Sequence, residues 1–114
     1  MAVSVPEKPP AGIENVSDEV SDLFRRLLSD WARDTMMSSD SVAILMHRAH
    51  YGIIGIGPPA LPLIFKDLAE GGGPWFVALQ AITHRNLTSP ENANDVRKLR
   101  EDWLEWGRAN GYLS

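Results

Sequence analysis

Three histidines are the clearest candidates for catalytic chemistry in this sequence. His47 and His50 lie three residues apart, so on a helix both imidazoles could reach one ion, and His84 could supply a third nitrogen ligand for Zn²⁺. No acidic residue that could orient an imidazole stands near either of the first two in the sequence. We therefore expect no metal and no other cofactor. We interpret His47 and His50 as residues at the end of a helix, where they interact with free carbonyl groups.

Other catalytic signatures are missing from the sequence. Gly52, Gly55 and Gly57 form no phosphate cradle, because no Walker lysine follows them and no strand precedes them. There is no Gly-x-Ser-x-Gly motif, and the absence of cysteine excludes a thiol nucleophile and a thiolate zinc cluster. We expect that the chain is not an enzyme, and we identify no small-molecule substrate.

The charge balance does not favour nucleic acid. Eleven Lys and Arg residues stand against fifteen Asp and Glu, a net charge of −4, whereas a phosphate-binding surface is normally basic. The basic residues near the C-terminal end are interleaved with acidic ones, and Arg97 with Glu101 and Lys98 with Asp102 have the spacing of helical ion pairs. We interpret that segment as a solvated helix surface, and expect no nucleic-acid partner.

Helices must position these residues, because apolar side chains recur at helical spacing in five segments and no convincing strand appears. Ser17 is expected to cap the first helix, and one of Ser38, Ser39 and Asp40 to cap the second. The glycines at 52, 55 and 57 favour a loop between the second and third helices, although Ile53 and Ile54 leave a short strand as an alternative. The expected helices cover about 18–37, 41–50, 58–70, 75–84 and 94–109.

The sequence divides into a tail and one domain. Residues 1–14 are Pro-rich and offer few apolar side chains, which predicts a flexible tail, and residues 15–114 are expected to form a single helical domain. No export signal is recognised, and the longest apolar run, 51–65, is broken by Gly and Pro and is too short to span a membrane. We expect a cytoplasmic protein without a membrane segment.

Two resemblances support an all-α fold. Residues 57–64, Leu68 and the run 78–82 resemble one HEAT-type repeat, which implies a compact α-α hairpin arrangement. The spacing of Trp31, the run 53–57 and Trp103-Leu104-x-Trp106-Gly107 is similar to that in a family of short uncharacterised bacterial proteins linked to phage-like or mobile elements. Neither resemblance implies an activity.

The tryptophans suggest where a partner would bind. Trp31, Trp75 and Trp103 lie on apolar stripes and are expected in the core. Trp106 lies at the margin of its stripe, where Gly107 is expected to leave space beside it.

Aromatic residues at the edge of a core often anchor interfaces. We therefore expect an interaction surface formed by Trp106, Phe76 and Leu104. The predicted function is a non-enzymatic helical protein-interaction module that binds a protein partner or a second copy of itself. The alternative is a DNA-associated accessory protein of a phage-like or toxin-antitoxin system.

Overall fold

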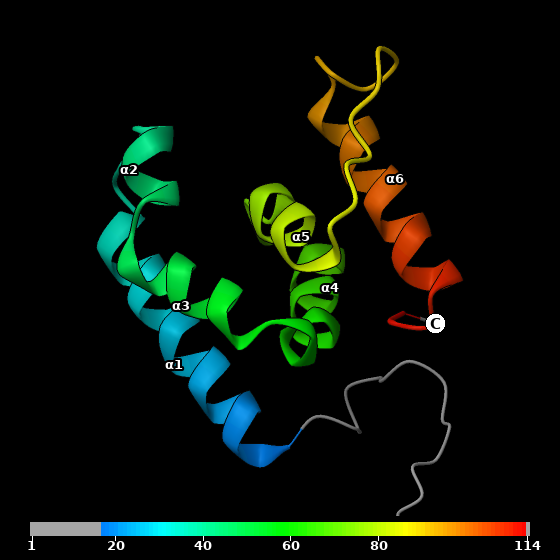
Figure 1. Cartoon of the computed structure of the whole chain (residues 1–114). Coiled ribbons are helices and arrows are strands. Elements are labelled where there is room, and N and C mark those ends of the chain that lie inside the picture. The colour runs from blue at the N-terminus through cyan, green and yellow to red at the C-terminus, as the bar shows by residue number, and fades with distance from the viewer. Residues whose placement is uncertain (1–16, 114) are drawn as a thin grey trace, which may run out of the picture.

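The computed structural model describes residues 17–113, and all regular secondary structure within them is helical (Figure 1). The predicted all-α class is confirmed, with six α-helices and one 3-10 turn in the described chain where about five helices were expected. The predicted tail, residues 1–14, lies outside the described residues. The elements are α1 (Asp18–Thr35), α2 (Ser41–Leu45), α3 (Arg48–Ile56), η2 (Pro58–Ala60), α4 (Leu61–Ala69), α5 (Phe76–Thr83) and α6 (Val96–Ala109).

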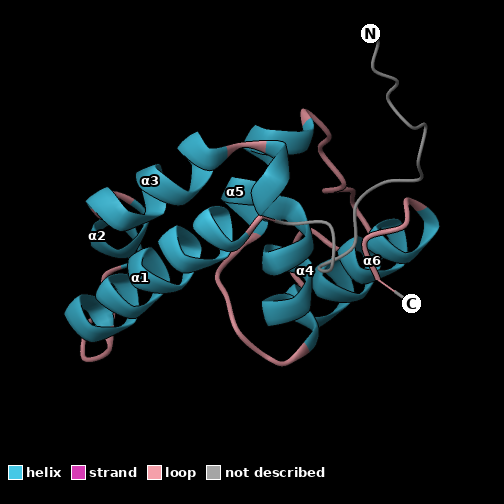
Figure 2. Cartoon of the chain, turned by 90° about the horizontal axis from the view of Figure 1, so that it is seen from below, coloured by secondary structure: helices cyan, strands magenta, loops and turns pink. Residues whose placement is uncertain are grey.

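The helices form two groups that meet through α3 and α5. Helix α1 packs most extensively against α3, and the short α2 lies over one end of this pair (Figures 1 and 2). Helix α4 packs against α5 and α6, and α6 lies on the side of the molecule away from α1 (Figure 2). The η2 turn contacts α1, α3 and α4, so it links the two groups.

Polar side chains define the starts of α1 and α2. The Ser17 hydroxyl accepts a hydrogen bond from the Val20 amide at 3.2 Å, as the sequence predicts. The Asp40 carboxylate accepts from the amides of Val42 and Ala43, which confirms its predicted role.

The segment 41–57 differs from the prediction of one helix followed by a loop. Helix α2 ends at Leu45, and a second helix, α3, begins at Arg48 and continues through Gly52 and Gly55 to Ile56. The break occurs because the His47 side chain caps the new helix by accepting from the Ala49 amide at 3.0 Å. Within this segment only Gly57 has a positive φ, 79°, and it ends α3.

Gly52 serves helix packing instead of chain reversal. A Cβ atom at this position would lie 3.1 Å from the nearest side-chain atom of Leu27 on α1. The absence of a side chain therefore lets α3 approach α1 closely. Ile53, the next residue, is fully buried in the interface that results.

The core is rich in aromatic side chains. Trp31, Trp75 and Trp103 are all buried, which confirms their predicted place in the core. The Trp75 ring lies 5.8 Å from the ring of Phe24 and 5.2 Å from that of Trp31, both on α1. These contacts join α1 to the start of α5, and each pair contributes about 0.5–1.5 kcal/mol beyond the burial of its area.

Gly107 does not leave space beside Trp106, contrary to the expectation. A Cβ atom here would lie 2.7 Å from a ring carbon of Phe65, which is fully buried. The glycine therefore allows α6 to approach the Phe65 ring on α4.

The length and apolar composition of a membrane-spanning segment are reached in the described chain only by two helices taken together. No single helix in the described chain is long and apolar enough to cross a membrane. The pair Arg48–Ile56 and Pro58–Ala69 reaches the required length and composition, across a bend of 101°.

Two glycine substitutions test the close contact between α4 and α6. Gly107→Ala should lower the free energy of unfolding by about 1–2 kcal/mol, because the overlap with buried Phe65 outweighs the gain in helix propensity. Gly55→Ala is the matched control, since no atom lies within 4 Å of the added Cβ, and it should raise stability by about 0.5–1 kcal/mol. Urea denaturation of both variants measures the difference. Stabilisation by Gly107→Ala would show that Phe65 can move away.

Candidate interaction surface

His47 is occupied by structural contacts on both of its ring nitrogens. Its Nδ1 accepts from the Ala49 amide, so the neutral ring carries its proton on Nε2, which lies 2.9 Å from Asp34 Oδ2. The sequence shows no acidic residue nearby, but the fold brings in Asp34 from α1, 13 positions earlier. The hydrogen bond with His47, together with that from Arg33, lowers the pKa of the Asp34 carboxyl group. His47 therefore ties α1 to the start of α3.

His50 is a buried side chain with one unused nitrogen. Its Nδ1–H donates to the Leu45 carbonyl at 2.8 Å, and its ring stacks on Trp31 with 4.9 Å between centroids. Its Nε2 is buried without a hydrogen-bond partner in the described part of the chain. Burial lowers the pKa of the His50 imidazole, while the bond to the Leu45 carbonyl opposes the shift.

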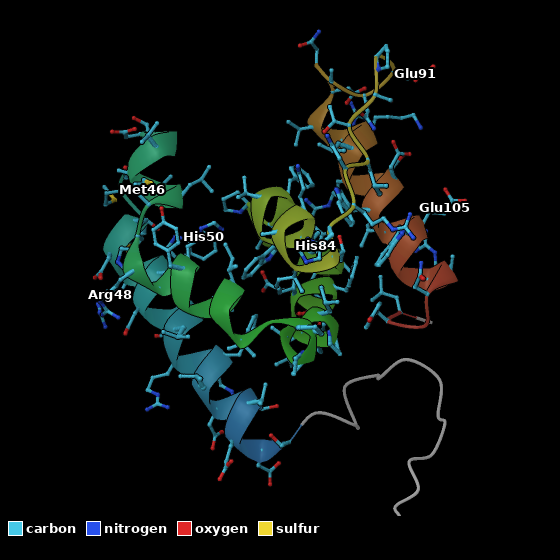
Figure 3. The ribbon with its side chains drawn as sticks, viewed as in Figure 1. Met46, Arg48, His50, His84, Glu91 and Glu105 are labelled. Atoms are coloured by element: carbon cyan, nitrogen blue, oxygen red, sulfur yellow. The ribbon has the colours of Figure 1, made fainter. Side chains whose placement is uncertain are left out.

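The three histidines do not form a metal site. His84 is an exposed residue at the C-terminal end of α5, with φ of 59°, whereas His50 lies at the junction of α2 and α3 (Figure 3). Across residues 17–113 no group of three His, Cys, Asp or Glu side chains is placed to hold a metal ion. The interpretation of His47 and His50 as residues at a helix end needs correction, because both lie at the start of α3. Only His50 meets a carbonyl group, that of Leu45.

The residues of the predicted interaction surface are partly buried. Phe76, Leu104 and Trp106 all pack against the core, and none is among the exposed large apolar side chains. The Trp106 ring stacks on Phe65 at 5.9 Å and on Tyr112 at 6.1 Å. Trp106 is therefore an edge aromatic, as expected, but much of its ring is covered by this stack. Its availability to a partner stays a prediction.

The basic face of α6 is partly used inside the molecule. Lys98 pairs with Asp102 at 3.0 Å, as predicted, whereas no pair between Arg97 and Glu101 is formed at salt-bridge distance. Arg100 donates to the Leu68 carbonyl at 2.6 Å. Lys98 and Arg100, two of the basic residues of α6, thus have structural partners.

A buried asparagine before α6 was not recognised from the sequence. Asn92 lies between the expected helices 75–84 and 94–109, yet it is almost fully buried. Its amide donates to the Leu87 carbonyl at 2.9 Å and to Asp102 Oδ2 at 2.7 Å, and its oxygen accepts from the Ser89 amide. The bond from Asn92, reinforced by Lys98, lowers the pKa of the Asp102 carboxyl group. This network fixes the loop on α6.

The most exposed apolar side chains gather at the opposite end of the molecule. Five of the eight large apolar side chains exposed in the described chain lie between positions 36 and 51, in the turn after α1, on and just after α2, and on α3. We call this set the methionine patch, and Figure 3 shows one of its members, Met46, beside α2. The exposed fraction is 91% for Met37 and 59% for Met46. The patch comprises Met36, Met37, Val42, Met46 and Tyr51.

The patch lies on a backbone that is held in place. The Trp31 indole N–H donates to the Ile44 carbonyl at 2.8 Å, which ties α2 to α1. The contact between His47 and Asp34 ties the next turn to the same helix. Within the patch, the Tyr51 hydroxyl donates to the Met46 sulfur at 3.0 Å.

The single helix predicted over 41–50 gives no sign of this surface, because Val42, Met46 and Ala49 then recur at helical spacing on one apolar stripe. In the structure Val42 and Met46 are exposed, and Ala49 of the same stripe is buried. The break between α2 and α3 changes the helical register, so the two halves of the stripe do not face the same way. The two adjacent methionines, Met36 and Met37, were a signal in the sequence that could have indicated an exposed apolar surface here.

Comparison with known proteins finds no matching family model, no matching curated protein and no matching solved structure. The resemblances to a HEAT-type repeat and to phage-linked bacterial proteins therefore stay predictions.

The buried imidazole predicts that acid destabilises the fold through His50. Its pKa is lowered in the folded state, so the unfolded chain takes up a proton near the ordinary value of 6.5 while the folded chain stays neutral. The stabilising contribution is complete above about pH 6.5 and is lost as the pH falls below it. His50→Phe should therefore reduce the slope of unfolding free energy against pH between about 5 and 6.5.

His84→Asn is the control for this measurement, because Asn tolerates the positive φ of that exposed position. It should leave the slope unchanged in urea denaturation at a series of pH values. If the slope for His50→Phe equals that of the original chain, the prediction that acid destabilises the fold through His50 is wrong.

Proposed function

We propose that this protein is a non-enzymatic helical interaction module that binds another protein through the methionine patch. The observation that carries the proposal is the concentration of exposed apolar side chains on one end of the α1–α2–α3 group. Patches of large exposed apolar side chains commonly mark sites of protein association, and the bond from the Tyr51 hydroxyl to the Met46 sulfur places two members of this patch in contact. A partner could be a different protein or a second copy of this chain, and both were expected from the sequence.

The side chains of the patch suit binding. Methionine is unbranched and polarisable, so it adapts its shape to an apolar partner and is frequent on surfaces of this type. Tyrosine adds a large rigid ring with a polar end, a combination enriched at interface hot spots. The rigid attachment of α2 to α1 means that little backbone order would have to be gained on binding, which reduces the entropic cost.

The patch has a mixed charge at its border. Asp30 bonds to Arg33 at 3.1 Å and to Arg48 at 3.2 Å, and Asp34 bonds to Arg33 and His47. The pairs made by the exposed Arg33 and Arg48 contribute little to stability, but they give the border both signs of charge. Such a border helps to orient a partner around an apolar centre.

The absence of cysteine fits a reducing compartment, and we propose the cytoplasm as the place of action. The DNA-associated alternative gains no support from Lys98, which pairs with Asp102, or from Arg100, which donates to the Leu68 carbonyl.

Photocrosslinking from the patch tests the proposal. The substitution Met37→p-benzoylphenylalanine places a photoreactive side chain in the patch. On illumination this side chain should form covalent protein adducts, either in the purified protein alone or in a cell extract. Adducts in the purified protein identify a second copy as the partner, and adducts formed only in extract identify a different protein. Glu105→p-benzoylphenylalanine is the control, since Glu105 is exposed on α6 far from Met46 and its neighbours (Figure 3).

A second variant removes the apolar character while keeping the probe. Val42→Ser with Met46→Ser should strongly reduce the adducts formed from position 37, because both side chains are exposed and their loss leaves the core intact. Adduct yields from position 37 that are no higher than from position 105, or that survive the double substitution, would refute the methionine patch as a binding surface.

A further inference from the structure

A separate cavity lies where α1 and α2 face the loop between α4 and α5. Its volume is about 460 Å³, within the range of small-molecule sites, which is roughly 300–1,000 Å³. Five of its lining residues are apolar and come from α1, α2 and the loop, and Thr35 adds a hydroxyl group that is already bonded to the Trp31 carbonyl. The walls are formed by Leu28, Trp31, Ala32, Thr35, Ile44, Asp67, Gly72, Gly73 and Pro74.

Asp67 is the one charged side chain among these lining residues. Its Oδ2 accepts a hydrogen bond from the Trp75 indole N–H at 2.8 Å, which fixes the orientation of the carboxylate. Gly72 lies against the same group, and a Cβ atom at that position would overlap the carboxylate. Among the ion pairs of residues 17–113, none includes Asp67, although it is half-buried. A fixed acidic group in an apolar wall favours a ligand that brings its own positive charge.

We propose that this cavity binds a small organic cation with an apolar body. The ammonium or guanidinium group would lie against Asp67, and the apolar body against Trp31, Ile44 and Pro74. An anion would meet the Asp67 charge without compensation, and a neutral apolar molecule would leave that carboxylate desolvated beside it. Asp67 therefore selects the cationic group of the ligand, and the apolar wall selects its apolar body.

The rigid walls favour binding without rearrangement. Trp31 is held by its bond to the Ile44 carbonyl and by its stack on His50, and Asp67 is held by Trp75. The cavity shares no lining residue with the methionine patch. The two proposals can therefore fail independently.

Titration with two matched probes tests the proposal in the complete chain. Phenethylammonium carries the expected charge and apolar ring, and 2-phenylethanol has the same ring and a neutral hydroxyl group. The ¹H–¹⁵N spectrum contains one indole signal for each of the four tryptophans. Phenethylammonium should shift the Trp31 signal in a saturable way and leave those of Trp103 and Trp106 in place.

Substitutions separate the charge from the shape of the cavity. Asp67→Asn keeps an oxygen that can accept from Trp75, and it should weaken phenethylammonium binding by about 10-fold or more while changing 2-phenylethanol binding less than about 2-fold. Glu70→Gln removes the same charge from a residue outside the cavity, so it should leave both affinities unchanged. Ala32→Leu adds bulk at the exposed edge of the cavity and should weaken both probes.

The dispersion of the four indole signals reports whether each variant is folded, and Ala32→Leu decides the test if Asp67→Asn unfolds the chain. The proposal would be overturned if the Trp31 signal did not move up to the solubility limit of phenethylammonium. Equal affinity for the two probes, equal effects of Asp67→Asn and Glu70→Gln, or unchanged binding to Ala32→Leu would overturn it as well.

Discussion

The hydrogen bond from the Trp31 indole to the Ile44 carbonyl is the contact on which one half of the molecule depends. Helix α2 has five residues, far too few for a helix that is stable by its own backbone bonds. Its position must therefore come from tertiary contacts, and this 2.8 Å bond from a buried ring is one that reaches its backbone directly. The same ring stacks on His50 and lies edge-on to Trp75, so it also joins α2 to the centre of the protein.

This arrangement explains why apolar side chains are left in solvent. A helix as short as α2 can bury one side against Trp31, but Val42 and Met46 then face outward. Their exposed side chains are accessible to a partner, as the proposed function requires. The cavity beside Asp67 depends on the same ring, since Trp31 and Ile44 both form its wall. The methionine patch and the cavity are thus separate consequences of one anchor.

Patterns in the sequence were sufficient where local physics decides the structure. The caps at Ser17 and Asp40 and the stripe that contains Phe24 and Trp31 follow from hydrogen-bonding groups and helical spacing within a few residues. The break after α2 could not be predicted in this way, because its cap is His47, whose ring is held by Asp34 on another helix.

The candidate sites were harder to predict from the sequence, because they too depend on contacts between residues that are distant along the chain. Asp67 appears as an ordinary acidic residue on a helix until the loop brings Trp75 and Gly72 against it. Exposure of Val42 and Met46 depends on a register change that no periodicity shows, and Trp106 is covered by Phe65 and Tyr112 from distant positions. Native-state hydrogen exchange of Trp31→Phe, which removes the indole donor but keeps an aromatic ring, tests the role of this anchor most directly. We predict that the Ile44 and Met46 amides lose protection while the Leu99 amide of α6 keeps most of its own; equal losses in both regions, or no loss in α2, would contradict the account.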